Sequence, residues 1–181
     1  MTRLSVFIAC SLDGYIATPE GDLGWLERAA RPGEDYGYDE FMSTVDALAM
    51  GRRTYDHIAG LDPLPFGERE VFVFTSTECE PREGVTFWRP TPRRAYATWQ
   101  ERGLERVYVD GGLLIGSFLE EGLIDDLTLT VVPLLLGAGR PLFHSGRPPA
   151  ALTLTGVRQW PSGLVNLSYD RDSGAPGRAL A

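Results

Sequence analysis

Two adjacent arginines stand where an apolar segment gives way to a helical one. In the stretch "AMGRRTYDHI" (49–58), Gly51 ends the apolar run, Arg52 and Arg53 follow, and Thr54 begins the expected helix. A helix N-terminus already carries unpaired N–H groups and partial positive charge, so two guanidinium groups there favour an anionic ligand such as a phosphate. The alternative is a solvated turn that carries two arginines, because the stretch lacks P-loop spacing.

A second stretch, "RVYVDGGLLIGSFLEEGL" (106–123), repeats this pattern of strand, glycine turn and helix. Gly111 and Gly112 remove side chains where backbone N–H groups would approach a ligand. Ligands of open α/β sheets bind beyond the carboxyl ends of the strands, between neighbouring helix starts. A tight turn is the alternative for this glycine pair. Two matched turns favour a ligand with several phosphates such as a dinucleotide, although neither has the G-x-G-x-x-G spacing.

Two aspartates at expected strand ends are candidates for acid–base chemistry. Asp110 directly precedes the glycine pair, where a buried carboxyl group is costly unless it is used or paired. Asp13 stands beside Gly14 after the first strand, where it either faces a substrate or bonds its own backbone in a turn. We therefore expect Asp110 and Asp13 to orient a substrate and to relay a proton.

Composition argues against several classes of function. The chain has 181 residues, a net charge of −8 and a pI near 4.8, which disfavours nucleic acid as a partner. Cys10 and Cys79 form no CxxC pair. Only His57 and His144 could join them, so we expect no metal site. No segment has the length of a membrane span, and we expect a cytoplasmic protein that acts on a small molecule.

Strand-like and helix-like segments alternate along the chain. Strands are expected at Leu4–Cys10, Ala47–Met50, Glu70–Thr75, Val85–Trp88, Arg106–Val109, Asp126–Leu136, Ala151–Gln159 and Leu164–Asp170, and helices at about Tyr38–Thr44, Thr54–Ile58, Pro92–Arg102 and Leu113–Glu121. This order predicts an α/β fold with a mixed, mainly parallel sheet of about eight strands, flanking helices and a C-terminal antiparallel hairpin. We expect one domain over 1–171 and a flexible tail over 172–181.

Four motifs in the same order resemble the dihydrofolate reductase superfamily. They are "ACSLDGYIA", "DALAMGRRTYD", "VFVFTST" and "VYVDGGLLIGSFLEEGLIDDLTLTVVPLLLGAGRPLF". The resemblance is closest to the reductase domain of bacterial riboflavin-pathway deaminase/reductases. It implies a dihydrofolate-reductase-like fold, NADPH as the hydride donor and a reductase activity.

The resemblance also implies the roles of particular residues. The cofactor contacts that it implies are Ala9, Trp25, Gly51, Arg52, Arg53, Thr54, Ser76, Gly111, Gly112, Leu114 and Ile115. Trp25 lies in "GDLGWL", which resembles the mobile loop over the nicotinamide; a half-buried tryptophan that packs a loop is the alternative. Asp110 matches an acidic position that contacts the substrate in the riboflavin-pathway branch.

The substrate half of the pattern departs from both known branches. Dihydrofolate reductases keep one acid in the first helix, and the spacing from Gly51 suggests Asp35 as a substrate-binding residue. Asp39 and Glu40 compete for this role, and all three also fit a solvated helix start. The riboflavin-pathway branch has arginines for a ribose phosphate, for which the corresponding segments offer only Arg69.

These observations predict an NADPH-dependent reductase that transfers a hydride to a C=N or C=O group of a pterin-like or pyrimidine-like molecule. The substrate would belong to the dihydrofolate or 5-amino-6-ribosylaminouracil phosphate class. A non-catalytic module that binds a nucleotide or flavin is the alternative. We also expect a homodimer, because "LTLTVVPLLLGAG" (127–139) is very apolar for a strand near a sheet edge and contains Pro133.

Overall fold

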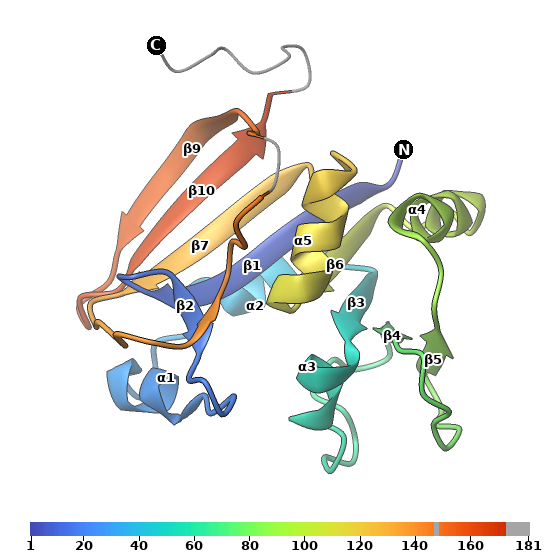
Figure 1. The fold of residues 1–181 in the computed structure, drawn as a ribbon, viewed down its shortest axis with the longest axis horizontal. Helices are drawn as coiled ribbons and strands as arrows, with labels where there is room; N and C mark the ends of the chain where they lie inside the picture. The colour runs from blue at the N-terminus through green and yellow to red at the C-terminus, as the bar shows by residue number, and fades with distance from the viewer. Residues whose placement is uncertain (147–148, 173–181) are drawn as a thin grey trace.

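One large sheet runs through the molecule, which the computed structural model describes over residues 1–146 and 149–172. Its strands are β1 (Arg3–Ser11), β3 (Ala47–Gly51), β4 (Glu70–Phe74), β5 (Val85–Trp88), β6 (Arg106–Asp110), β7 (Asp126–Val132), β9 (Leu152–Gln159) and β10 (Val165–Arg171). Within the described residues these eight strands lie in the order β5-β4-β3-β6-β1-β7-β10-β9 (Figure 1). All pairs from β5 to β7 are parallel, whereas β10 is antiparallel to both β7 and β9. The expected mixed, mainly parallel sheet with a C-terminal hairpin is confirmed.

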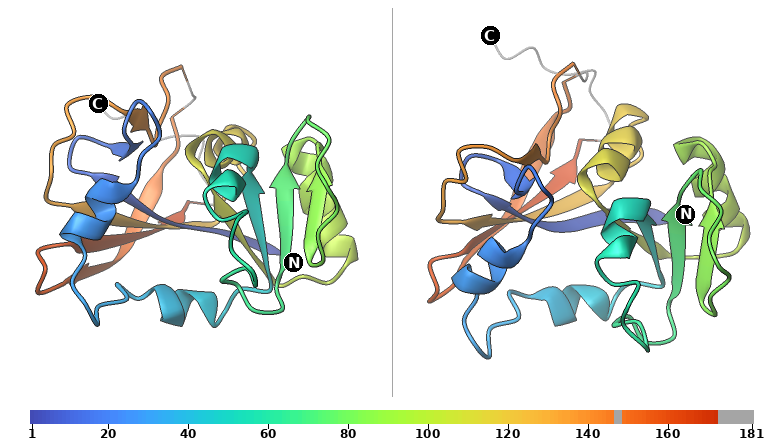
Figure 2. Two further views of the ribbon diagram at one scale, coloured as in Figure 1. Left: turned by 90° about the horizontal axis from the view of Figure 1, so that it is seen from below. Right: turned by 60° about the horizontal axis from the view of Figure 1, so that its bottom comes forward.

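Short helices and a small second sheet surround these strands. The helices are α1 (Gly24–Ala29), α2 (Tyr38–Met42), α3 (Arg52–Asp56), α4 (Pro92–Glu101) and α5 (Gly112–Glu120), and the second sheet pairs β2 (Tyr15–Ala17) with β8 (Arg140–Pro141). Helices α4 and α5 lie on one face of the large sheet and α2 lies on the other (Figure 2). The sheet is therefore the middle layer of the fold.

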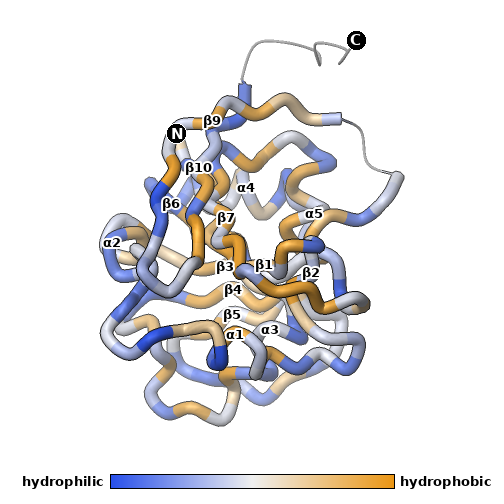
Figure 3. Tube along the Cα trace, turned by 90° about the vertical axis from the view of Figure 1, so that its left-hand side faces the viewer, coloured by the Kyte–Doolittle hydropathy of each residue, from blue (hydrophilic) through white to orange (hydrophobic). Residues whose placement is uncertain are grey.

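Strand alternation separates the core into two clusters. In β6, Val107 and Val109 pack against α4 and α5, while Tyr108 between them packs on the opposite side with α2 and α3. Figure 3 shows hydrophobic positions concentrated in the strands at the centre and polar positions in many of the surrounding loops. Because both faces of the central strands are covered, β3, β4 and β6 are continuous apolar runs, as their sequences predicted.

Helix α4 begins where its sequence predicts. The Thr91 hydroxyl accepts a hydrogen bond from the Arg94 N–H at 3.3 Å, and Pro92 occupies the first helical turn. The beginning of the first glycine-turn helix was predicted less well, because α3 begins at Arg52 rather than at Thr54. Helix α1 and the small sheet were not expected at all.

Strand β7 differs most from its prediction. It ends at Val132 rather than at Leu136, because Pro133 has no N–H to donate and the following loop bonds elsewhere. In that loop, the Leu134 carbonyl accepts a hydrogen bond from the Leu12 N–H at 2.8 Å. Strand β7 also lies inside the sheet, between β1 and β10, so the expectation that this segment is near an edge is wrong. The expected tail at 172–181 lies, apart from Asp172, outside the described residues.

Candidate active site

Two strand-to-helix turns meet at the carboxyl ends of β3 and β6. Met50 and Asp110 are paired in the register of these parallel strands, so the turns that follow them leave the sheet side by side. A Cβ atom added to Gly111 would lie 2.5 Å from the Oγ1 atom of Thr54 and 3.8 Å from the N atom of Gly51. Gly111 also has a φ of +92°, which L side chains rarely adopt. Glycine therefore allows the second turn to approach the first this closely.

No side chain caps the helix start at either turn. Helix α3 follows Gly51 and helix α5 follows Gly111, and neither start has a side-chain cap hydrogen bond. A Cβ atom on Gly112 would lie 2.8 Å from the Cδ1 atom of Ile16, so this glycine lets α5 pack against β2. Uncapped N–H groups in two adjacent first turns are suited to an anionic ligand.

Leu114 and Ile115 lie in the first turns of α5, but their side chains belong to the core. Both are buried in the cluster that also contains Phe118. The Ile115 N–H donates to the Gly111 carbonyl at 2.9 Å. Ile115 therefore presents neither its side chain nor its N–H to a ligand, and Leu114 offers only its backbone.

The two arginines of the first turn have different surroundings. The Nε atom of Arg52 donates to the Oδ1 atom of Asp56 at 2.6 Å, and its Nη1 atom lies 2.7 Å from the Sγ atom of Cys79. Arg53 is exposed and has no hydrogen bond or ion pair with the other described residues. Ser76 is also exposed, in the segment after β4. Arg53 is thus available to a ligand, whereas Arg52 must first leave Asp56.

Asp110 is the carboxyl group whose chemistry the fold alters most. It is half-buried at the end of β6, and one of its oxygens accepts a hydrogen bond from the Gly111 N–H at 2.8 Å. Burial raises the pKa of Asp110 to about 6, although this N–H and the Tyr108 hydroxyl oppose the rise. A carboxyl group with this pKa exchanges its proton near neutral pH, which is suited to a general acid.

Two tyrosines that the sequence analysis did not single out lie beside Asp110. The Tyr108 hydroxyl donates to the Phe7 carbonyl at 2.7 Å, and the Tyr38 ring meets the Tyr108 ring edge-on at 6.5 Å. Burial, and then the charge of Asp110, raise the pKa of Tyr38 to about 12 and that of Tyr108 well above its usual value. Tyr108 could have been found from sequence, because residues two apart in a strand share a face. Tyr38 lies in α2, far from Asp110 in the sequence, so no local pattern indicates that the two are close.

Asp13 and Asp35 bond mainly to the backbone. Asp13 is exposed, and its carboxylate accepts hydrogen bonds from the Ser11 hydroxyl at 2.6 Å and from the N–H groups of Leu136 and Gly137. The Ser11 hydroxyl in particular lowers the pKa of Asp13. These bonds favour the turn role that the sequence left open, and the catalytic role of Asp13 stays a prediction.

Asp35 accepts hydrogen bonds from two N–H groups at the beginning of α2. The donors are the Gly37 and Asp39 N–H groups, each at 3.1 Å, and together they lower the pKa of Asp35. The Asp35 side chain is exposed, as is that of Glu40, which lies 3.7 Å from Arg158. The arrangement favours a solvated helix start, and substrate binding by Asp35 stays a prediction.

Trp25 lies inside the fold rather than over its surface. Its side chain is 1% exposed and packs with Val132 and Leu164, and Ala9 lies at the edge of the same cluster. The indole N–H has no hydrogen-bond partner among the described residues. The structure therefore brings together Ala9 and Trp25, and leaves a buried donor without an acceptor close to the end of β1.

Arg69 is occupied by the protein itself. Its guanidinium donates to the carbonyl oxygens of Val45, Phe66 and Met42 at 2.8–3.0 Å. These bonds hold the loop before β4 against the end of α2. Arg69 is therefore a poor substitute for an arginine that binds a substrate phosphate.

Neither a metal cluster nor a membrane helix is found in the described part of the chain. No group of three or more histidine, cysteine, aspartate or glutamate side chains is placed to hold a metal ion there. None of the helices in residues 1–146 and 149–172 has the length and apolar character needed to cross a membrane.

Comparison with known proteins defines the family. Residues 64–166 match the family model described as "RibD C-terminal domain", and the chain belongs to this family. A relative in Bacillus subtilis (strain 168), "Uncharacterized protein YwjB", is 37% identical over 175 residues, which cover 94% of this chain and 99% of that protein. The resemblance to riboflavin-pathway reductase domains is thereby confirmed, and it supports a reductase-type role.

Solved structures support the same fold. The "Putative riboflavin biosynthesis protein" from Shewanella sp. PV-4 has a TM-score of 0.86 and 34% identity, covering 94% of this chain and 99% of that one. Dihydrofolate reductase from Enterococcus faecalis has a TM-score of 0.64 and 18% identity, covering 94% and 96%. The chain therefore has a dihydrofolate-reductase-like fold.

Proposed function

We propose that this protein is an NADPH-dependent reductase that transfers a hydride to a C=N or C=O group of a pterin-like or pyrimidine-like molecule. The observation that carries the proposal is the contact between its two glycine turns, where Gly111 approaches the Thr54 hydroxyl. Two adjacent, uncapped helix starts with a free arginine beside them suit a dinucleotide that carries an additional phosphate. Family membership supports the reductase class.

The cofactor half of the proposed site consists of residues with separate tasks. The first turns of α3 and α5 would bind the pyrophosphate through N–H groups, with Thr54 and Gly111 at their junction. Arg53 would bind the 2′-phosphate of NADPH in a bidentate manner, and Arg52 would join it after leaving Asp56. Ser76 would line the same phosphate from the segment after β4. This division predicts that Arg53 contributes to the preference for NADPH over NADH.

The substrate half of the proposed site is centred on Asp110. NADPH supplies the hydride when it is bound, so the protein must orient the substrate and supply one proton. Asp110 would hold that proton on its carboxyl oxygen and transfer it to the nitrogen or oxygen atom that is double-bonded to the carbon receiving the hydride. Tyr38 and Tyr108 would exclude water from this carboxyl group.

The dihydrofolate and 5-amino-6-ribosylaminouracil phosphate classes both contain such a heterocycle. Because Arg69 is occupied by backbone carbonyls, it offers nothing to the ribose phosphate of the second class. This arrangement favours recognition through the ring rather than through a phosphate. Both classes belong in the assay so that the comparison is direct.

The proposal is tested by cofactor binding and then by turnover. NADPH is titrated against the protein with tryptophan fluorescence as the readout, and its oxidation is followed with dihydrofolate, quinonoid pterins and aminouracil phosphates. Stereospecific transfer of deuterium from labelled NADPH to a product would establish the reductase. Binding of NADPH without oxidation by any of these compounds would instead favour a non-catalytic nucleotide-binding module. Absence of NADPH binding would refute the reductase proposal.

A further inference from the structure

A carboxylate already contacts one of the two arginines of the first glycine turn. The Nε atom of Arg52 donates to the Oδ1 atom of Asp56 at 2.6 Å, and the Nη1 atom of Arg52 lies 2.7 Å from the Sγ atom of Cys79. A guanidinium binds a phosphate most strongly through two neighbouring nitrogen atoms at once. Because Asp56 holds Nε and Cys79 lies against Nη1, only Nη2 is free of both partners. A phosphate would therefore compete with the Asp56 carboxylate for this guanidinium.

The ion pair between Arg52 and Asp56 is exposed enough to exchange. The two residues lie one helical turn apart on α3, and their side chains are 40% and 49% exposed. Pairs of this kind stabilise a protein only weakly, because water screens both charges. Arg53, in contrast, has no hydrogen bond or ion pair with the other described residues. One arginine of the turn is thus neutralised by a carboxylate, whereas the charge of the other is uncompensated.

We propose that Asp56 is a specificity-determining residue for the cofactor, because its carboxylate competes with the 2′-phosphate of NADPH for Arg52. This inference rests on the proposed function, in which both arginines bind that phosphate. To reach Arg52, the phosphate has to replace Asp56 and then remains close to a carboxylate of like charge. NADH lacks the phosphate and meets neither obstacle. Asp56 therefore narrows the preference for NADPH over NADH that the two arginines create.

Helix α3 brings together two kinds of group that recognise the ribose of a dinucleotide. In dinucleotide-binding domains of another fold, a carboxylate accepts a hydrogen bond from the ribose 2′-hydroxyl of NAD, whereas an arginine accommodates the 2′-phosphate of NADP. Here Asp56 and Arg52 supply one group of each kind, and they bond to each other in the protein without cofactor. This combination suits a site that accepts both cofactors rather than one that excludes NADH.

Cofactor titration of Asp56→Asn tests the proposal. The variant keeps a polar side chain of similar shape but carries no negative charge, so Arg52 becomes available to the phosphate. NADPH should bind about three- to tenfold more tightly than it binds to the wild type, because a weak ion pair and a like-charge repulsion are both removed. NADH binding should not become tighter. Asp56→Ala also removes the carboxylate and should give the same result.

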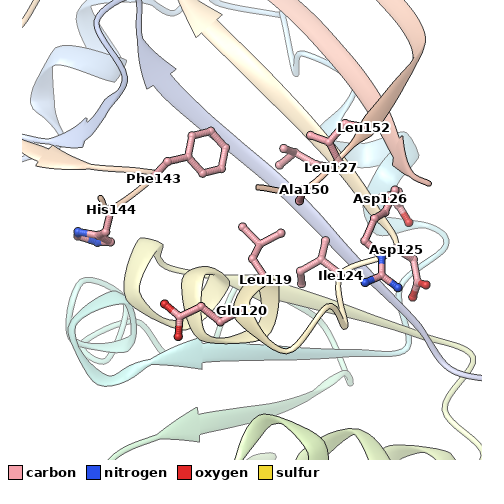
Figure 4. A pocket seen from close by; sticks show the side chains of 11 residues that line it. Leu119, Glu120, Ile124, Asp125, Asp126, Leu127, Phe143, His144, Ala150 and Leu152 are labelled. Atoms are coloured by element: carbon pink, nitrogen blue, oxygen red, sulfur yellow. The ribbon is translucent and has the colours of Figure 1, made fainter. Parts of the chain in front are cut away.

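Two further variants locate the effect. Glu120→Gln is the matched control, because it removes an exposed negative charge at the opposite end of α5 from Gly112, next to Leu119 in the hollow that Figure 4 shows. It should leave both dissociation constants unchanged. In the Arg52→Ala background, Asp56→Asn should tighten NADPH binding by about twofold or less, since only the repulsion between carboxylate and phosphate is then removed.

The outcomes separate this inference from the proposed function. A wild type that does not bind NADPH overturns both. If the wild type binds NADPH, unchanged or weaker NADPH binding by the two Asp56 variants overturns the competition alone. Equal tightening with and without Arg52 overturns it as well, because Arg52 would then play no part. Tryptophan fluorescence gives the dissociation constants, and circular dichroism checks that each variant is folded.

Discussion

Replacement of Gly111 by alanine should separate the two turns on which the site depends. The new Cβ atom would lie 2.5 Å from the Thr54 hydroxyl oxygen, an overlap whose relief costs about 1–3 kcal/mol. The backbone conformation of Gly111, with φ +92° and ψ +125°, adds about 1–3 kcal/mol for a residue with a side chain. We therefore expect Gly111→Ala to lower the free energy of unfolding by about 2–6 kcal/mol.

A second glycine with a positive φ shows the backbone effect without the contact. Gly84 has a φ of +73° and no atom within 4 Å of an added Cβ, so Gly84→Ala should cost only the backbone part, about 1–2 kcal/mol. Thr54→Ala supplies the second control, because it removes the overlapping oxygen and leaves the Thr54 Cβ at 3.7 Å. The double variant Gly111→Ala/Thr54→Ala should therefore recover about 1–3 kcal/mol relative to the sum of the single changes.

Equilibrium unfolding in urea measures all four variants against the wild type. NADPH titration of the variants that remain folded adds a functional readout, and Gly111→Ala should weaken binding more than Gly84→Ala. The reasoning fails if Gly111→Ala is no more destabilising than Gly84→Ala. It also fails if removal of the Thr54 hydroxyl gives no recovery, because the two turns would then not be in contact.

Three further predictions concern charged side chains. Arg53→Ala should weaken NADPH binding about ten- to a hundredfold, because a charge-assisted hydrogen bond contributes about 1.5–3 kcal/mol. NADH binding should weaken much less. Equal losses for both cofactors in a fluorescence titration would contradict this role of Arg53. Asp110→Asn should stabilise the fold above pH 6 by at most about 3 kcal/mol and have little effect below about pH 4, because the carboxyl group resists ionisation only in the folded state. Unfolding curves above pH 6 and below pH 4 measure this change in stability. The same variant should lose turnover while it retains NADPH binding, which NADPH oxidation assays and titrations measure. Asp13→Asn should lower the melting temperature at pH 7, and should lower it less at pH 3. The reason is that the pKa of Asp13 is lowered in the folded state, so the ionised carboxylate stabilises the fold only above the pKa of the unfolded state. An equal decrease in melting temperature at pH 7 and pH 3 would contradict the loop-anchoring role.

Several features of the site could be predicted from the sequence alone. The buried runs of β3 and β6, the glycines after them and the Thr91–Pro92 helix start are local patterns, and each lies where it was expected. The beginning of α3 was displaced by two residues. The missed helix α1 and the small sheet are short and depend on packing rather than on local pattern.

The sequence by itself indicated two glycine turns at the carboxyl ends of strands. Parallel strands place their carboxyl ends on one edge of the sheet, so both turns were expected at that edge. That β3 and β6 are adjacent strands was decided by the sheet topology, because β4 and β5 lie between them in the sequence. The sequence also indicated that Asp110 would be buried, because it ends an apolar strand, but how far its pKa would be raised was decided only by the tertiary structure. Desolvation depends on every group that surrounds a carboxyl, and local spacing does not encode that.

Tertiary structure also decided the partners of side chains that are far apart along the chain. Tyr108 bonds the Phe7 carbonyl across 101 positions, and Arg69 is occupied by Met42 and Val45, so neither role follows from a local motif. Hydrophobic periodicity and glycine positions determine local structure over a few residues, so they can be read from the sequence. The burial of a side chain and its hydrogen-bond partners depend instead on how the whole chain packs.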